Sequence, residues 1–196
     1  MQTTADLPQP TEYLPSGQRE LLLVVAVECA GDFGLARLSM ADVARRAGVS
    51  RQTLYRYFTS KEELLAAAVA AEAELLLSEC LSAALSERTP RAGLQAALTR
   101  GLEAPRQHPL LTRLLRTEPE SLLPLLTSHQ GPVMARVRQV LDVLLADDGV
   151  ALSRRPAVVD LLARLVLSHA ICPSGDPAQH AALWTELALS TPAVRA

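Results

Sequence analysis

The chain has 196 residues, of which 49% are hydrophobic and 3% aromatic, and it carries 19 basic against 21 acidic residues. This length allows one large or two small domains with a core of Leu, Ala and Val. Leu and Ala favour helices and no stretch shows sustained β-type alternation, so we predict an all-α protein. The three cysteines are far apart in apolar helical contexts, which fits neither a disulfide framework nor a metal site, and no cofactor is predicted.

The N-terminal segment, residues 1–16, is polar, contains several prolines and has no basic residue. We predict that it forms a flexible arm. It has neither the basic n-region nor the apolar h-region of a signal peptide, and apolar runs such as residues 21–27 are far shorter than the ~18 residues of a membrane span. A cytoplasmic protein with no membrane partner is therefore expected.

A first helix is predicted to begin at Ser16 or Gly17 and to end at Gly34. Two short helices, 40–47 and 51–58, are predicted to follow, with Ser39 and Ser50 as their N-caps and Gly48 supplying the positive φ of the turn between them. Six apolar residues fall at spacings that let the short helices pack on one small core. They are Val43, Ala44, Ala47, Val49, Leu54 and Phe58.

Once these residues are inside, an unusual polar set faces outward. It comprises Arg51, Gln52, Thr53, Tyr55, Arg56 and Tyr57. Residues 37–61 carry six basic residues and one acidic residue, about +5, which leaves −7 for the remainder of a chain whose formal net charge is −2. Positive charge concentrated on one helix-turn-helix indicates a polyanion site, and the alternative is an ordinary solvated surface.

The run AxxAGVSxxTLYxYFxSKExL, preceded by a helix that ends at Gly34, resembles the DNA-binding domain of the tetracycline-repressor (TetR) family of transcription regulators. The resemblance covers about residues 19–65, and beyond them it is one of architecture only. Ala30 and Leu35 stand where the family usually has large aromatic residues, and Gln52 stands where a small residue is common. These departures leave the expected fold unchanged but make the operator sequence unpredictable.

The resemblance implies a helix-turn-helix domain over residues 17–60 whose second short helix enters the major groove of double-stranded DNA. Arg51 is expected to bond guanine O6 and N7, Gln52 to read adenine, and Tyr55 to contact a base edge or a thymine methyl. The alternative for Tyr55 is partial burial as a packing residue. Four residues match family positions that usually hold phosphates, namely Ser39, Thr53, Tyr57 and Lys61.

Residues 61–196 are predicted to form a helical ligand-binding and dimerisation domain. Ser60 and Glu63 form a capping box at the start of a helix that runs to about Arg88, roughly 40 Å at ~1.5 Å per residue. Pro124 is expected to kink or restart its helix, because it removes one backbone hydrogen bond. Prolines then delimit the other expected helices, at about 90–107, 110–117, 119–128, 132–149, 156–172 and 177–190.

One head offers few contacts, so a homodimer on a palindromic operator is expected. The last two helices are the predicted seam, in agreement with the family, whose members dimerise through their C-terminal helix pair. His169 is expected to be a seam or core residue rather than a ligand contact. The predicted interface residues are Val158, Leu162, Leu165, His169, Ala181 and Trp184.

The segment 108–130, broken by prolines, resembles the irregular helices that leave a cavity in family members. Leucine-rich walls predict a small apolar or acyl-like effector. The available polar anchors are His108, Arg113, Arg116, Glu118 and His129. The alternative is that these charges lie on the surface and the leucines form ordinary core.

The sequence thus predicts a ligand-responsive transcriptional repressor that binds its operator as a dimer and is released by the effector through a population shift. An enzyme is not expected, because the four histidines are scattered and no HExxH, GxSxG or CxxC arrangement occurs. The alternative is a helical small-molecule-binding or scaffolding protein with a vestigial DNA-binding head. Such a protein would show no salt-dependent binding to any duplex.

Overall fold

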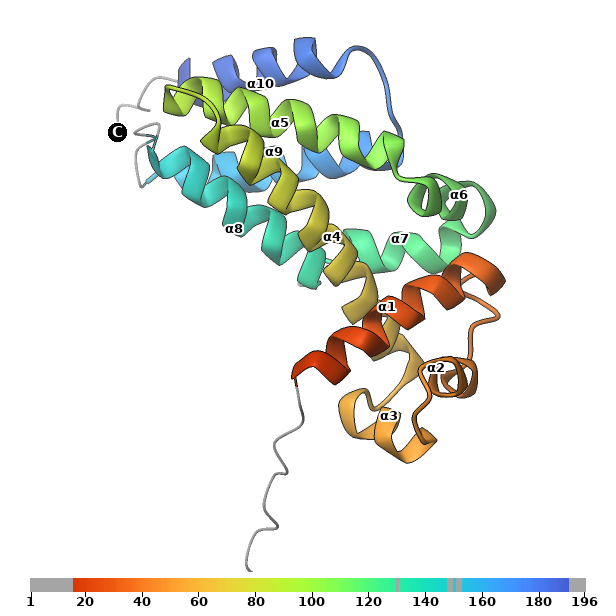
Figure 1. The fold of residues 1–196 in the computed structure, drawn as a ribbon. Coiled ribbons are helices and arrows are strands. Elements are labelled where there is room, and N and C mark those ends of the chain that lie inside the picture. The colour runs from red at the N-terminus through yellow and green to blue at the C-terminus, as the bar shows by residue number, and fades with distance from the viewer. Residues whose placement is uncertain (1–15, 130, 148–149, 151–152, 191–196) are drawn as a thin grey trace, which may run out of the picture.

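The structure, a computed structural model, describes residues 16–129, 131–147, 150 and 153–190, and ten helices make up this part of the chain (Figure 1). No strand occurs among these residues, which confirms the all-α prediction. The predicted arm lies outside the described residues except for Ser16, the first residue of the first helix. No helix in the described ranges is long and apolar enough to cross a bilayer.

The N-terminal head consists of three helices, which lie together at one end of the molecule (Figure 1). Both predicted N-caps are confirmed, since Ser39 Oγ accepts from the Asp42 amide at 3.2 Å and Ser50 Oγ from the Thr53 amide at 3.0 Å. Gly48 has a φ of +69° between the two short helices, as predicted. The helices are α1 (Ser16–Phe33), α2 (Met40–Arg46) and α3 (Arg51–Tyr57).

The predicted core of the head is largely confirmed. Val43, Leu54 and Phe58 are almost completely buried against α1, whose Leu22 and Ala26 are also fully buried. Two predicted members, Ala47 and Val49, lie half-buried at the edge of this core. The short helices therefore owe their stability to packing on α1, because seven-residue helices are not stable on their own.

Helix α4 (Lys61–Leu85) links the head to the rest of the molecule (Figure 1). Its 25 residues extend for about 37 Å. Ser60 Oγ accepts from the Glu63 amide at 3.1 Å, as the predicted capping box requires. The Glu63 carboxylate reaches one residue further back than expected, because it accepts from both the amide and the hydroxyl of Thr59, at 2.7 and 2.6 Å.

Replacing Ser60 by alanine is expected to lower the free energy of unfolding by about 0.5–2 kcal/mol, because it removes the acceptor for an otherwise unpaired amide at the start of α4. Urea denaturation of the purified chain measures the change. Ser82→Ala, at an exposed position in the last turn of the same helix, is the matched control and should cause no loss. Equal losses in both variants would show that the cap contributes nothing.

The body of the molecule contains six further helices, two of them only nine residues long, arranged around the distal part of α4 (Figure 1). Proline stands in the first turn of most of them, where its missing N–H is not needed. Pro124 lies inside α7, which continues past it, so the predicted restart of the helix does not occur. The helices are α5 (Pro90–Gln107), α6 (Pro109–Thr117), α7 (Pro119–Thr127), α8 (Pro132–Asp147), α9 (Arg155–Ile171) and α10 (Pro177–Ser190).

Ion pairs between helices reinforce the apolar packing of the body. The guanidinium of Arg136 on α8 donates to both carboxylate oxygens of Glu74 on α4, at 2.5 and 2.6 Å. This hydrogen bond lowers the pKa of the Glu74 carboxyl. Arg100 on α5 pairs with Glu79 on α4 at 2.5 Å. The distal part of α4 is thus held in the body, while its first turn belongs to the head.

Candidate nucleic-acid interface and ligand cavity

The outer surface of α3 presents the three predicted base-reading side chains. Arg51 and Gln52, in the first turn, are exposed, and Tyr55 is 50% exposed. Among the residues that the structure describes, none of the three side chains makes a hydrogen bond or an ion pair. Tyr55 is thus half covered by the protein, so partial burial as a packing residue stays the alternative to a base contact. The three side chains are available to an external partner at the end of the molecule farthest from α10 (Figure 1).

The four predicted phosphate-contacting residues are all engaged within the protein. Ser39 caps α2, Thr53 Oγ1 lies 2.8 Å from Ser50 Oγ, the Tyr57 hydroxyl donates to Gln18 Oε1 at 3.0 Å, and Lys61 Nζ donates to the Ala36 carbonyl at 2.8 Å. The Tyr57 bond joins α3 to α1 and the Lys61 bond joins α4 to the turn between α1 and α2, whereas the other two bonds are local to one helix. The contacts of all four residues with phosphate stay predictions, and Lys61 in particular has a structural role besides.

The positive charge of the head is smaller than the sequence window suggested. Arg46 on α2 pairs with Glu28 and Asp32 on α1, and Arg45 pairs with Asp42. Glu28 and Asp32 precede the window of residues 37–61. Over residues 16–61 the chain has seven basic and four acidic residues, about +3. The excess is still positive.

A cavity of about 80 Å³ lies where the head meets the body. Its walls come from α1, α4, α6 and α7, together with Leu35 from the turn between α1 and α2. Fourteen of its sixteen lining residues are apolar, and the two polar ones are Glu72 on α4 and His108 at the start of α6. Three of the apolar residues, Ala26, Val27 and Ala30, belong to α1, so an occupant would touch the head directly.

Of the five predicted anchors, only His108 lines this cavity. Arg113 instead donates to the carbonyl of Ala30, in the last turn of α1, at 2.8 Å. Glu118 Oε2 accepts from the amide of Ala36 at 2.8 Å. The placement of both as ligand anchors is therefore wrong. The end of α6 and the start of α7 at Pro119 lie against the head, and the polar side chains there bond the backbone of the head instead.

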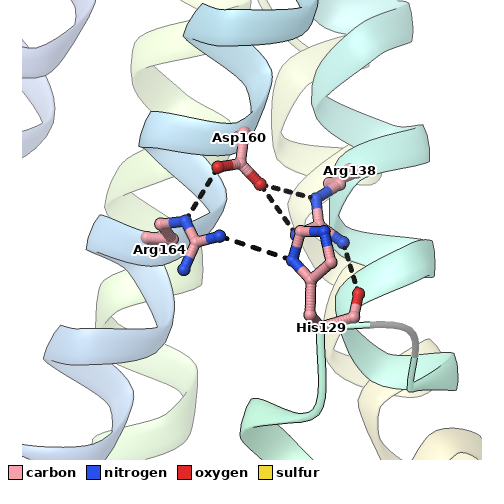
Figure 2. Close-up of polar contacts among 4 residues, drawn as sticks. All are labelled: His129, Arg138, Asp160 and Arg164. Carbon is pink, nitrogen blue, oxygen red and sulfur yellow. Dashed lines mark hydrogen bonds and ion pairs between the residues drawn. The ribbon is translucent and has the colours of Figure 1, made fainter.

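Arg116 and His129 also lie away from the cavity, which corrects the prediction for them. Arg116 is exposed at the end of α6. His129, after α7, lies in a polar cluster with Arg138 on α8 and with Asp160 and Arg164 on α9 (Figure 2). Arg138 also donates to the His129 carbonyl at 2.9 Å. This cluster ties the end of α7 to α8 and α9.

Asp160 holds the cluster together, because its two carboxylate oxygens accept from Arg164 at 2.7 Å and from Arg138 at 2.7 and 3.0 Å (Figure 2). These hydrogen bonds, that from Arg164 first, lower the pKa of the Asp160 carboxyl. A carboxyl with a lowered folded-state pKa stabilises the fold above its unfolded pKa of about 3.9, and this contribution is lost as the pH falls below that value.

Asp160→Asn is expected to lower the melting temperature at pH 7, with a difference from the parent protein that shrinks as the pH falls below about 4. Thermal denaturation between pH 7 and pH 3.5 measures this. Asp142→Asn, which removes an exposed carboxylate from α8, is the matched control and should have little effect. A deficit for Asp160→Asn that stays constant over the whole range would contradict the linkage.

The predicted dimer seam lies partly inside the protomer. Leu162, Ala181 and Trp184 are at most 5% exposed, because they pack in the core of the body, so their placement at a subunit surface is wrong. Val158, Leu165 and His169 are half-buried, and the His169 ring lies edge-on to that of Trp184, with 4.8 Å between centroids. The same two helices expose other large apolar side chains, namely Leu161, Leu183 and Leu187.

Glu72 is the site residue that sequence reasoning missed. It lies on α4 in the cavity wall with Leu65, Ala68, Val69 and Leu76, spaced three or four residues apart as one helix face requires. A signal was present, because an acidic residue within an otherwise apolar stripe of a helix is unusual in a core. Glu72 lies outside residues 108–130, the segment in which the cavity was predicted.

The head is a helix-turn-helix with an exposed polar second helix, and it is joined to a helical body that contains a cavity, so the chain has the architecture of a DNA-binding regulator. A family model described as "Bacterial regulatory proteins, tetR family" matches residues 22–68, and one described as "Bacterial Tetracyclin repressor, C-terminal domain" matches residues 90–189. The protein belongs to the TetR family of bacterial transcription regulators.

Relatives and solved structures agree with this assignment. An uncharacterized HTH-type transcriptional regulator of Mycobacterium tuberculosis is 29% identical over 77% of this chain and 73% of its own length. The transcriptional repressor KstR of Mycolicibacterium smegmatis is 35% identical over 50% of this chain and 48% of its own. The repressor AlkX of Dietzia sp. strain DQ12-45-1b superposes with a TM-score of 0.70 at 25% identity, covering 91% of this chain and 95% of that one.

Proposed function

We propose that the protein is a ligand-responsive transcriptional repressor that binds a palindromic operator as a homodimer and is released by a small apolar effector. The observation that supports this best is the position of the cavity, whose wall includes α1 of the DNA-binding head as well as α4, α6 and α7. An occupant of this space favours whichever arrangement of the head accommodates it, and thereby shifts the population of DNA-competent molecules.

An apolar or acyl-like effector is supported by the chemistry of the wall and by neighbouring structures. The cavity is lined mainly by leucine and alanine. AlkX is implicated in the biodegradation of n-alkanes. FadR of Bacillus subtilis, which shares the fold at a TM-score of 0.54 and 14% identity, was solved with stearoyl-CoA. The effector of this chain is accordingly proposed to be apolar over most of its length.

The assembly is proposed to be a two-fold dimer through α9 and α10, in the cytoplasm where the operator lies. Leu161 on α9 and Leu183 on α10 are 57% and 53% exposed, and large apolar side chains of this kind on two neighbouring helices are typical of a subunit interface. Two heads in one assembly would place two copies of α3 on half-sites one helical turn, or a multiple of one, apart.

The decisive experiment selects genomic DNA fragments bound by the full chain and then measures binding to the selected duplex and to a scrambled duplex between 50 and 300 mM salt. We expect a palindromic sequence, specific binding with a steep negative salt slope, and two protomers per duplex by light scattering. A protein with a vestigial head would give no enriched sequence and no salt-dependent binding to either duplex. That result would overturn the proposal.

A further inference from the structure

The polar end of the cavity is formed by Glu72 and His108. Their side chains are 30% and 22% exposed, so this polar part of the wall can be reached from solvent, whereas Leu114 and Leu122 are buried. His108 Nε2 is 3.1 Å from Glu72 Oε2. A polar pair at one end of an apolar cavity is the usual device for orienting a ligand, and its hydrogen-bonding state determines which head group fits.

The position of the proton on His108 follows from its second contact. His108 Nδ1 accepts a hydrogen bond from the amide of Leu111 at 3.2 Å and so caps the start of α6. A nitrogen that accepts carries no proton, so the imidazole is neutral in this arrangement and its N–H is Nε2–H, which donates to Glu72. Both ring nitrogens are therefore occupied.

The polar pair leaves a hydrogen-bond acceptor, an oxygen of the Glu72 carboxylate, for a ligand. Over the described residues, no hydrogen bond is made to the other carboxylate oxygen of Glu72, Oε1. The sixteen lining residues include neither lysine nor arginine, because Arg113 bonds the backbone of α1 and Arg116 is exposed. An anionic head group would thus face a carboxylate with no cation among the lining residues, and the two like charges would repel each other.

The apolar part of the ligand would extend along α4 away from Glu72. A second cavity of about 80 Å³ shares Ala73, Leu76, Leu111 and Leu126 with the first, and it continues along α4 towards Cys80. Burial raises the pKa of the Cys80 thiol to about 11, so this wall is uncharged. Beyond Glu72, the α4 residues that line the two cavities run on to position 80, about 12 Å along the helix. The shape suits an elongated molecule.

We propose that the effector is an elongated apolar molecule with a hydrogen-bond donor at one end, a hydroxyl or a protonated amine, which donates to Glu72. The proposal rests on the proposed function, since it concerns the ligand of the same cavity. The proposal narrows the class of effector to molecules with a donor. An ionised carboxylic acid of equal length has no proton to donate, and its negative charge is repelled by the Glu72 carboxylate. Glu72 is then the residue that determines head-group specificity.

Titration calorimetry of the full-length protein with four probes of similar length tests this: octan-1-ol, octylamine, octanoate and heptyl methyl ether. The alcohol or the amine should bind about 5- to 150-fold more tightly than octanoate and the ether, because the latter two leave the Glu72 acceptor without a donor. In Glu72→Gln the preference for the amine should disappear and the gap to octanoate should narrow. Glu87→Gln, exposed beyond the end of α4, is the matched control and should retain the parental ranking.

Each result bears on the proposal. Octanoate binding as tightly as the alcohol, an unchanged ranking in Glu72→Gln, or no binding of any probe would overturn the donor-headed effector. Measuring duplex binding with the same protein preparation distinguishes a failure of the proposed effector class from a failure of the proposed function. Salt-dependent operator binding that persists while the head-group preference is absent rejects only the effector class, whereas loss of operator binding rejects the regulator itself.

Discussion

Replacing Arg51 by alanine is expected to weaken binding to the selected operator by about 2–6 kcal/mol per dimer and to relax the choice of base at the contacted position. The reason is that each of the two α3 helices loses a bidentate guanidinium–guanine pair, which contributes about 1–3 kcal/mol of discrimination. Arg51 is exposed in the first turn of α3, so its removal should leave the fold intact. Fluorescence anisotropy with the operator and with a scrambled duplex at one salt concentration measures the change.

The control for this prediction is Arg88→Ala, which removes one exposed positive charge from the turn between α4 and α5, far from α3. It should change affinity for both duplexes only slightly. If Arg51→Ala weakened the operator and the scrambled duplex equally, Arg51 would be a phosphate contact and not a base reader. Lys61→Ala is a less informative comparison, because Lys61 also holds the carbonyl of Ala36.

The head could be predicted closely from sequence because its signals are local. Ser39 and Ser50 bond amides three residues away, and Gly48 needs only its own backbone conformation to turn the chain. Such features are determined by neighbours in the sequence, and they fix both the boundaries and the faces of the short helices. The exposure of Arg51 follows once Leu54 and Phe58 are assigned to the core.

The cavity anchors could not be predicted in the same way, because their partners are remote. Arg113 and Glu118 bond backbone groups 83 and 82 residues earlier in the chain. A charged residue in a leucine-rich segment fits a ligand anchor and an interdomain contact equally well until the other partner is known. Three of the six predicted seam residues are buried in the protomer for a related reason. Helix α9 carries adjacent leucines, Leu161 and Leu162, and periodicity alone does not tell which one faces the protomer's own core.

The misassigned Glu118 leads to the second large effect, which concerns the connection between cavity and head. The peptide groups on either side of Ala36 are held from two sides, the N–H by Glu118 Oε2 and the C=O by Lys61 Nζ, both at 2.8 Å. Glu118 immediately precedes α7, whose Leu122 and Leu126 line the cavity. Gly34, with a φ of +83°, leaves room for this approach, since a Cβ there would collide with the Glu118 carboxylate. Displacement of α7 by an occupant would therefore pull directly on the turn between α1 and α2.

Glu118→Ala is accordingly expected to retain operator affinity within about twofold but to reduce the effector-induced loss of affinity, for which about 5- to 150-fold is typical of coupled sites, by at least half on a logarithmic scale. Anisotropy titrations with and without octan-1-ol measure the coupling, and hydrogen exchange at the Ala36 amide, expected to be faster in the variant, measures the contact without any ligand.

Two further variants make the Glu118 result interpretable. Glu118→Gln keeps an acceptor oxygen at the same place and should restore most of the coupling and of the protection at Ala36. Glu120→Ala removes an exposed carboxylate from the first turn of α7 and should behave as the parent protein. If the Ala36 amide exchanged at the parental rate in Glu118→Ala, the contact would carry no stability. The α4 helix would then be the connection that transmits the signal, because it runs continuously from the head past the cavity into the body.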